Sequence, residues 1–140
     1  MLLHIVARGK IGRSSEAELV ERYLKRIAWP TRLTELPDSG GKVPPEERDA
    51  ALIVLDEKGR DLSSVELARL LAQWRDGGRR EARFLIGAAD GHDQAERTRA
   101  DLVLSFGKAT WPHLLVRAML AEQLFRATAI VAGHPYHRDG

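Results

Sequence analysis

Three largely apolar runs of strand length constrain the fold of this chain more than any other feature, at residues 51–55, 82–86 and 102–106. Short continuous apolar runs are typical of strands buried on both faces of a parallel sheet. Stretches with helical spacing separate them, as at Leu67, Leu71 and Trp74 before the glycine pair at 77–78. Strands and helices thus alternate, which predicts an α/β fold with helices on both faces of a parallel sheet.

Start and stop signals define the remaining elements. A capping box of Ser15 with Glu18 predicts a helix over residues 15–28, which Pro30 ends. Pro112 suits the first turn of a long helix that runs to Ala132. The pattern further predicts a buried strand at residues 1–7, a strand at 32–36, a loop at 37–47, a turn at 56–59 and a short helix at 94–100.

The length and composition exclude several classes of protein. A chain of 140 residues has the length of one domain, so we expect a single domain over residues 1–140. The absence of cysteine excludes a disulfide scaffold, a thiolate zinc site and a cysteine nucleophile. No charge-free apolar run approaches the roughly 20 residues that cross a bilayer, and no signal peptide is recognisable. We therefore expect a cytoplasmic protein that has no membrane segment and binds no metal.

Glycine-containing loops leave three of the predicted strands, at residues 56–59, 87–91 and 107–111. Ligands of open α/β sheets bind outside the carboxyl ends of the strands. Each loop alone is compatible with an ordinary strand-to-helix turn, whereas three loops at one edge favour a pocket. None carries a dinucleotide fingerprint or a Walker loop, and the chain lacks the nucleophile elbow of serine hydrolases.

The long helix after Pro112 is apolar nearly all round, yet it carries Arg117, Glu122 and Arg126. A helix of this kind is buried, and buried charges need partners. Glu122 and Arg126 are four residues apart and can pair along one face. Two interpretations of Arg126 remain open: an ion pair at a subunit interface, or an arginine that holds an anionic or electron-rich substrate.

An aromatic and basic tail, His-Pro-Tyr-His-Arg at residues 134–138, follows this helix. Chain ends are usually poorly ordered, and a poorly ordered end does not explain this set of aromatic and basic residues. Aromatic rings stack on nucleic-acid bases, and arginine binds phosphate. The histidines could also bind a metal, but no second cluster of ligands has suitable spacing.

At these residues the chain resembles a known family. The order of its motifs, above all the terminal His-Pro-Tyr-His-Arg, is similar to that of the RlmH family, the bacterial 23S rRNA pseudouridine N3-methyltransferases of the SPOUT (trefoil-knot) superfamily. The resemblance covers essentially the whole chain. Its other pieces are Leu55-Asp56 with Gly59, residues 86–91, Thr110 with Pro112-His113, Leu115-Val116-Arg117, Glu122-Gln123 and Phe125-Arg126-Ala127.

The resemblance implies a homodimer that binds S-adenosyl-L-methionine (SAM) in a deep C-terminal trefoil knot, here from about residue 82 to residue 140. It implies a site at the subunit interface and, as substrate, a pseudouridine in helix 69 of 23S rRNA on the assembled ribosome. By position, the residues expected to line the cofactor pocket are Leu55, Gly87, Phe106, Gly107, Lys108, Ala109, Thr110 and Trp111.

The candidate catalytic residues lie in the tail and at the end of the long helix. We expect Tyr136 to stack on or orient the base, and Arg138 and Arg126 to hold phosphate or the developing anion. His137 either accepts the imide proton or contacts RNA without transferring a proton.

Two departures from the family pattern concern the cofactor loop and the middle of the chain. Ala88 replaces the second of two adjacent glycines, and the segment between Pro37 and Ala51 is too short for the helix that family members usually have there. Two alternatives therefore stay open. One is a knotted methyltransferase for another rRNA or tRNA site, and the other is a dimeric ribosome-binding module whose cofactor site has decayed.

Overall fold

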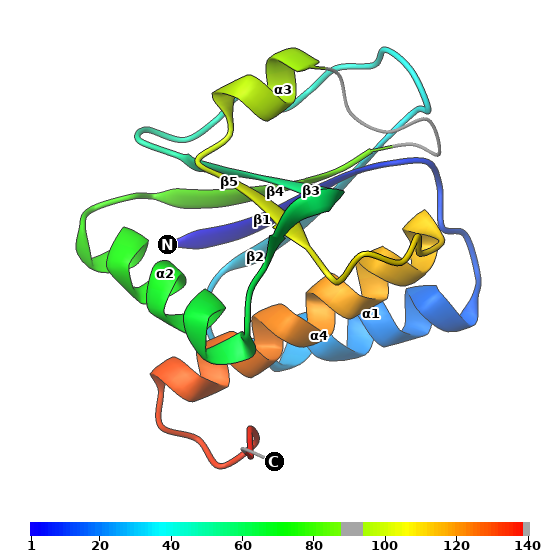
Figure 1. The fold of residues 1–140 in the computed structure, drawn as a ribbon. Coiled ribbons are helices and arrows are strands. Elements are labelled where there is room, and N and C mark those ends of the chain that lie inside the picture. The colour runs from blue at the N-terminus through cyan, green and yellow to red at the C-terminus, as the bar shows by residue number, and fades with distance from the viewer. Residues whose placement is uncertain (88–93, 139–140) are drawn as a thin grey trace.

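The computed structural model describes residues 1–87 and 94–138 of the chain. Five strands and four helices alternate along these residues as the sequence predicts, except that the second and third strands follow each other without a helix between them (Figure 1). In chain order the elements are β1 (Leu2–Arg8), α1 (Ser15–Arg26), β2 (Thr31–Leu36), β3 (Ala51–Asp61), α2 (Ser64–Asp76), β4 (Glu81–Ile86), α3 (Gln94–Arg99), β5 (Leu102–Ser105) and α4 (His113–Val131).

The strands form one five-stranded sheet in the order β2-β1-β4-β3-β5, and every neighbouring pair is parallel. Phe84 of β4 pairs with Ile5 of β1 on one side and with Ile53 of β3 on the other, so β4 lies at the centre of the sheet. The apolar runs therefore form the buried strands that the sequence predicts.

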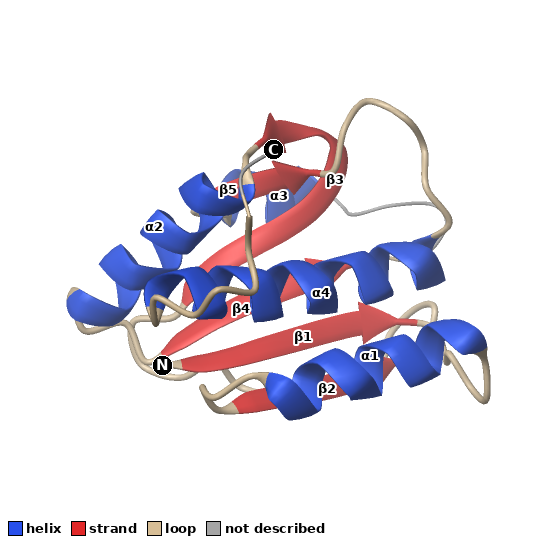
Figure 2. Cartoon of the chain, turned by 90° about the horizontal axis from the view of Figure 1, so that it is seen from below, coloured by secondary structure: helices blue, strands red, loops and turns tan. Residues whose placement is uncertain are grey.

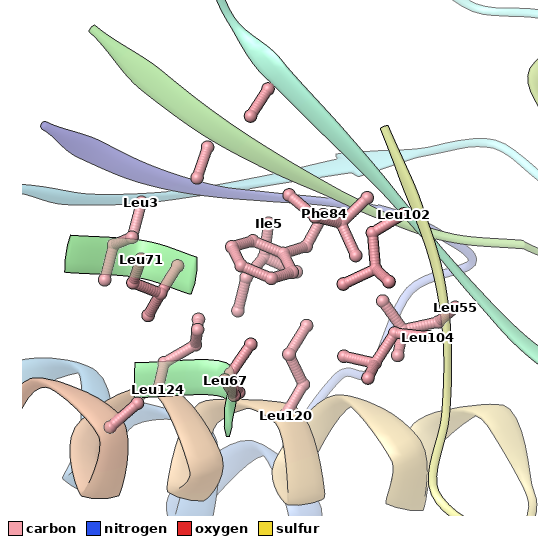
Figure 3. Close-up of a cluster of buried hydrophobic side chains, with 14 of the residues drawn as sticks. Leu3, Ile5, Leu55, Leu67, Leu71, Phe84, Leu102, Leu104, Leu120 and Leu124 are labelled. Carbon is pink, nitrogen blue, oxygen red and sulfur yellow. The ribbon is translucent and has the colours of Figure 1, made fainter. Parts of the chain in front are cut away.

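The two faces of the sheet are covered differently. Helices α1, α4 and α2 pack side by side on one face, whereas α3 and residues 37–50 lie over the other (Figures 1 and 2). The main core fills the space between the sheet and the three-helix layer (Figure 3). Leu120 and Leu124 of α4 reach into this core and are fully buried beside Phe84. The prediction of helices on both faces is confirmed, with most of the helical cover on one of them.

A buried polar network fills the opposite face. Arg83 donates to the carbonyl oxygens of Pro44 (2.6 Å) and Pro45 (2.9 Å) and pairs with Glu81 (2.7 Å). Glu81 accepts a hydrogen bond from the backbone N–H of Glu47 at 2.8 Å. Residues 37–47 have no helix or strand, as predicted. Backbone groups of this segment therefore bond to the buried charged side chains of Arg83 and Glu81, and these bonds attach the segment to the sheet. Buried charged groups need such partners.

His4 completes this network. Its Nδ1 lies 3.0 Å from Glu81 and its Nε2 lies 2.7 Å from the hydroxyl of Thr34. Burial lowers the pKa of His4, and this effect is larger than the rise in pKa that its hydrogen bond to Glu81 causes. Burial raises the pKa of Glu81, but the hydrogen bonds from Arg83 and Glu47 outweigh it and hold that pKa below its usual range. The network is thus a neutral imidazole beside an ionised carboxylate and a guanidinium.

Two local predictions are wrong. The turn expected at residues 56–59 does not end its strand, because β3 continues to Asp61; Leu55 and Arg60 both pair with Leu104, so the four residues between them form a bulge. The cap of α1 is Ser14 rather than Ser15: its hydroxyl accepts the N–H of Ala17. Ser14 has the extended backbone that a cap requires, whereas Ser15 is already helical.

Within the described residues, no helix is long and apolar enough to span a membrane. The trefoil knot stays a prediction, because the path of residues 82–140 includes residues 88–93, which lie outside the described part of the chain, as does Ala88.

Candidate functional site

The strand register brings the predicted cofactor residues to one edge of the sheet. Leu55 of β3 pairs with Leu104 of β5, and Val54 pairs with Leu85 of β4. Gly87 directly follows β4, and Phe106 directly follows β5. Leu55, Gly87 and Phe106 therefore lie together at the carboxyl edge, where parallel sheets bind ligands.

Residues 106–111 form an open stretch that leaves β5 at this edge. The hydroxyl of Ser105 donates to the carbonyl of Gly107 (2.7 Å) and accepts its N–H (3.1 Å), which turns the chain sharply. Gly107 has a φ of 101°, a conformation that favours glycine, and among the described residues no atom beyond its chain neighbours lies within 4 Å of the position that a Cβ would take. The backbone of Gly107 thus borders free space.

The rest of the stretch is exposed. Among the described residues, the backbone N–H groups of Lys108, Ala109 and Thr110 have no hydrogen-bond partner. The indole of Trp111 donates to the carbonyl of Phe106 at 3.3 Å and is 44% exposed, which is unusual for a side chain of this size. The stretch offers backbone donors and an aromatic surface to a ligand.

Arg117 anchors the start of α4, a contact that the sequence analysis did not predict. Its guanidinium is fully buried, pairs with Glu35 of β2 at 2.5 Å and donates to the carbonyl of Gly9 at 3.0 Å. Burial raises the pKa of Glu35, but the N–H of Ile11 and the Arg117 charge outweigh it and lower that pKa. Arg117 and Glu35 are 82 positions apart in sequence, so no local pattern indicates the pair.

The predicted catalytic residues gather at the other end of α4. Arg126 pairs with Glu122 at 2.7 Å, as their spacing predicts. The tail turns back along α4 (Figure 2). The Tyr136 ring stands edge-on to Phe125, with centroids 4.5 Å apart. Arg126 lies over that ring at 4.8 Å and approaches Nδ1 of His137 at 3.1 Å. Tail and helix form one cluster.

The electrostatics of this cluster favour a protonated phenol. Burial, together with the nearby Glu122 carboxylate, raises the pKa of Tyr136 above its ordinary value. The phenol is therefore a hydrogen-bond donor at neutral pH rather than a base. Arg138, the last described residue, is exposed. The cluster presents an aromatic ring, a guanidinium and an imidazole on the protein surface.

The two halves of the predicted site lie far apart within one chain. Helix α4 separates residues 106–111, at its start, from Arg126 and the tail. His113 and Arg126 are 13 residues apart, which corresponds to about 20 Å along a helix axis. The described residues contain no group of three or more His, Asp or Glu side chains that could hold a metal ion.

Known proteins match this chain over its full length. The family model described as predicted SPOUT methyltransferase matches residues 1–137. The chain is 69% identical to a protein of Rhizorhabdus wittichii and 65% identical to one of Erythrobacter litoralis, each over 140 residues and the full length of both chains. Both proteins carry the name ribosomal RNA large subunit methyltransferase H.

A solved structure shares the fold. It is that of a probable methylase family protein from Haemophilus influenzae, with a TM-score of 0.62 and 12% sequence identity over 98% of this chain and 70% of the other. The family model and the full-length relatives confirm the resemblance found in the sequence. The chain is a member of the SPOUT methyltransferase family and groups with the proteins named ribosomal RNA large subunit methyltransferase H.

Proposed function

We propose that this protein transfers a methyl group from SAM to N3 of a pseudouridine in helix 69 of 23S rRNA, on assembled ribosomes in the cytoplasm. The observation that carries the proposal is full-length identity of 69% with a protein named ribosomal RNA large subunit methyltransferase H. The aromatic and basic cluster of α4 and the tail supports an RNA substrate, since such groups bind bases and phosphates.

Residues at the carboxyl edge of the sheet fit the cofactor. The backbone N–H groups of Lys108, Ala109 and Thr110 lack partners in the described structure, and the space beside Gly107 is open. Leu55 and Phe106 provide apolar contacts at the same edge. SAM bound here would supply an electrophilic methyl group, so the main task of the protein is to align the acceptor with it.

The residues of α4 and the tail act on the acceptor. Tyr136, with its raised pKa, orients the base through its ring and hydroxyl. Arg126 is held at 2.7 Å by Glu122, and its guanidinium stabilises the anion that forms when the imide nitrogen loses its proton. Arg138 binds phosphate, and His137 contacts the RNA or accepts that proton.

A second copy of the chain brings the two halves of the site together. Within one chain about 20 Å of helix separates residues 106–111 from Arg126. Helix α4 carries partly exposed apolar residues, among them Leu114, Leu115 and Met119. Burial of such a surface favours association. In the homodimer that we propose, the tail of one subunit faces the cofactor stretch of the other.

Two experiments test this function. Calorimetric titration of the protein with SAM should show saturable binding, and the absence of both heat and a thermal shift at millimolar SAM contradicts the enzyme assignment. Ribosomes that lack the modification should be methylated by the wild type and much less by Arg138→Ala and Tyr136→Phe. Wild-type rates in both variants contradict the role of the tail. Binding of ribosomes without SAM binding would instead identify a ribosome-binding module.

A further inference from the structure

The bulge in β3, residues 56–59, contacts both the proposed cofactor stretch, residues 106–111, and helix α3, whose Glu96 and Arg99 line a pocket together with Gly87. Leu55 of β3 pairs with Leu104 of β5. The next four residues of β3 lie outside the pairing with β5, and Arg60 then pairs with Leu104 again. Gly59 makes the return possible: a Cβ there would lie 2.5 Å from the carbonyl oxygen of Val103. A β-bulge of this kind redirects side chains at the edge of a sheet.

Glu57, in the middle of the bulge, holds residues 105–110. Its carboxylate accepts a hydrogen bond from the Thr110 hydroxyl at 2.6 Å. Its carbonyl oxygen lies 3.2 Å from the Ser105 hydroxyl and shares the single hydrogen of that hydroxyl with the Gly107 carbonyl, while the hydroxyl oxygen accepts the N–H of Gly107. Glu57 therefore contacts the cofactor stretch at its beginning and near its end.

Asp56 holds α3 on the other side of the bulge. One carboxylate oxygen accepts the N–H of Lys58 at 2.9 Å, which closes the local turn, and the other pairs with Arg97 of α3 at 2.8 Å. The Asp56 side chain is 9% exposed, so this ion pair is better shielded from water than a surface pair. All six residues of α3 are at least partly exposed. The helix thus depends on polar contacts rather than on core packing.

We infer that Asp56 and Glu57 are positioning residues for the cofactor pocket: they fix residues 106–111 and α3 in the arrangement that binds SAM. The inference rests on the proposed function and names residues of the same site. Neither side chain needs to touch the reacting atoms. Loss of either side chain lowers the fraction of molecules whose pocket is correctly arranged. The apparent affinity for the cofactor falls in proportion to that fraction.

Three variants separate the contacts. Asp56→Asn keeps an oxygen for the Lys58 N–H but removes the charge that pairs with Arg97. Glu57→Ala removes the Thr110 contact, whereas Glu57→Gln keeps an acceptor for that hydroxyl and should rescue it. Asp76→Asn is the matched control, because Asp76 forms a surface ion pair with Arg75 at the end of α2.

We expect Asp56→Asn and Glu57→Ala to raise the dissociation constant and KM for SAM about three- to tenfold. Thermal stability and the KM for ribosomes should stay close to wild type. Glu57→Gln and Asp76→Asn should bind SAM like the wild type. In the protein without SAM, amide hydrogen exchange should rise over residues 94–99 in Asp56→Asn and over residues 106–111 in Glu57→Ala.

Equal SAM affinity and unchanged exchange in Asp56→Asn and Glu57→Ala would overturn the inference while the proposed function stands. Weaker SAM binding in Glu57→Gln, to the extent seen in Glu57→Ala, would also overturn it, because the hydroxyl contact would then not be the cause. A wild-type protein that binds no SAM would overturn the proposed function itself.

Discussion

Replacement of Arg117 by methionine tests the contact that attaches α4 to the edge of the sheet. Methionine has a similar reach and packs in apolar surroundings, so Arg117→Met removes the charge without leaving a large cavity. The substitution deprives the Glu35 carboxylate and the Gly9 carbonyl of their partner at 2.5 Å and 3.0 Å. The Gly9 carbonyl then lacks this donor, and the Glu35 carboxylate loses its charged partner while it still accepts the N–H of Ile11 at 2.9 Å.

The cost follows from the burial of the pair. Loss of one partner of a fully buried pair costs about 3–5 kcal/mol, because the remaining charge is uncompensated. Arg117 is fully buried, but Glu35 is 34% exposed and water can solvate its carboxylate in the variant. We therefore expect a loss of about 2–3 kcal/mol. For a chain of this size that corresponds to a fall in Tm of about 6–12 °C.

Thermal and urea unfolding measure this effect, with Arg22→Met on the exposed side of α1 as control. Glu35→Gln should cost a similar amount, because it leaves the buried guanidinium without a carboxylate. The double variant should lose less than the sum of the two, as expected for residues in direct contact. A Tm for Arg117→Met within about 1 °C of wild type, or strictly additive losses, would refute the reasoning.

Three further predictions concern other parts of the chain. Burial holds the pKa of His4 below the value of an unfolded histidine, about 6.5; unfolding therefore takes up a proton, and the free energy of unfolding should fall as the pH drops below about 6.5. His4→Gln should flatten this dependence in urea titrations across that range, and an unchanged slope would argue against it. Gly59→Ala should lower stability by about 1–3 kcal/mol in thermal unfolding, because its Cβ meets the backbone of Val103; a wild-type Tm would show that the bulge adapts. Arg126→Ala should slow ribosome methylation by about tenfold or more while SAM affinity stays unchanged, and equal loss of both would place Arg126 in the cofactor pocket.

The sheet could be predicted from the sequence because its signals are local. Each apolar run is long enough for one strand, and the end of each run marks the carboxyl edge of the sheet. The resemblance places Leu55, Gly87 and Phe106 in one pocket, and the strand register puts them at one edge. The Glu122–Arg126 pair was predictable for the same reason, because its partners are four residues apart on one helix.

The features that were not predicted depend on contacts between distant segments. The bulge at residues 56–59 looks like a turn in sequence, and only the return pairing with Leu104 shows that the strand continues. The Arg117–Glu35 pair joins α4 to β2. Glu81 and Arg83 likewise join separate segments, because their side chains bond to backbone groups of residues 44–47. No pattern of side chains in the sequence indicates contacts to backbone groups.

Methylation of a pseudouridine of 23S rRNA, the proposed activity of this protein, can be measured directly. Ribosomes from a strain without the corresponding gene should be incubated with the purified protein and SAM, and the helix 69 fragment analysed by mass spectrometry. We expect one methyl group on a pseudouridine of that fragment, only when both protein and SAM are present. An unmodified fragment from ribosomes that lack the methyl group at the start would contradict it.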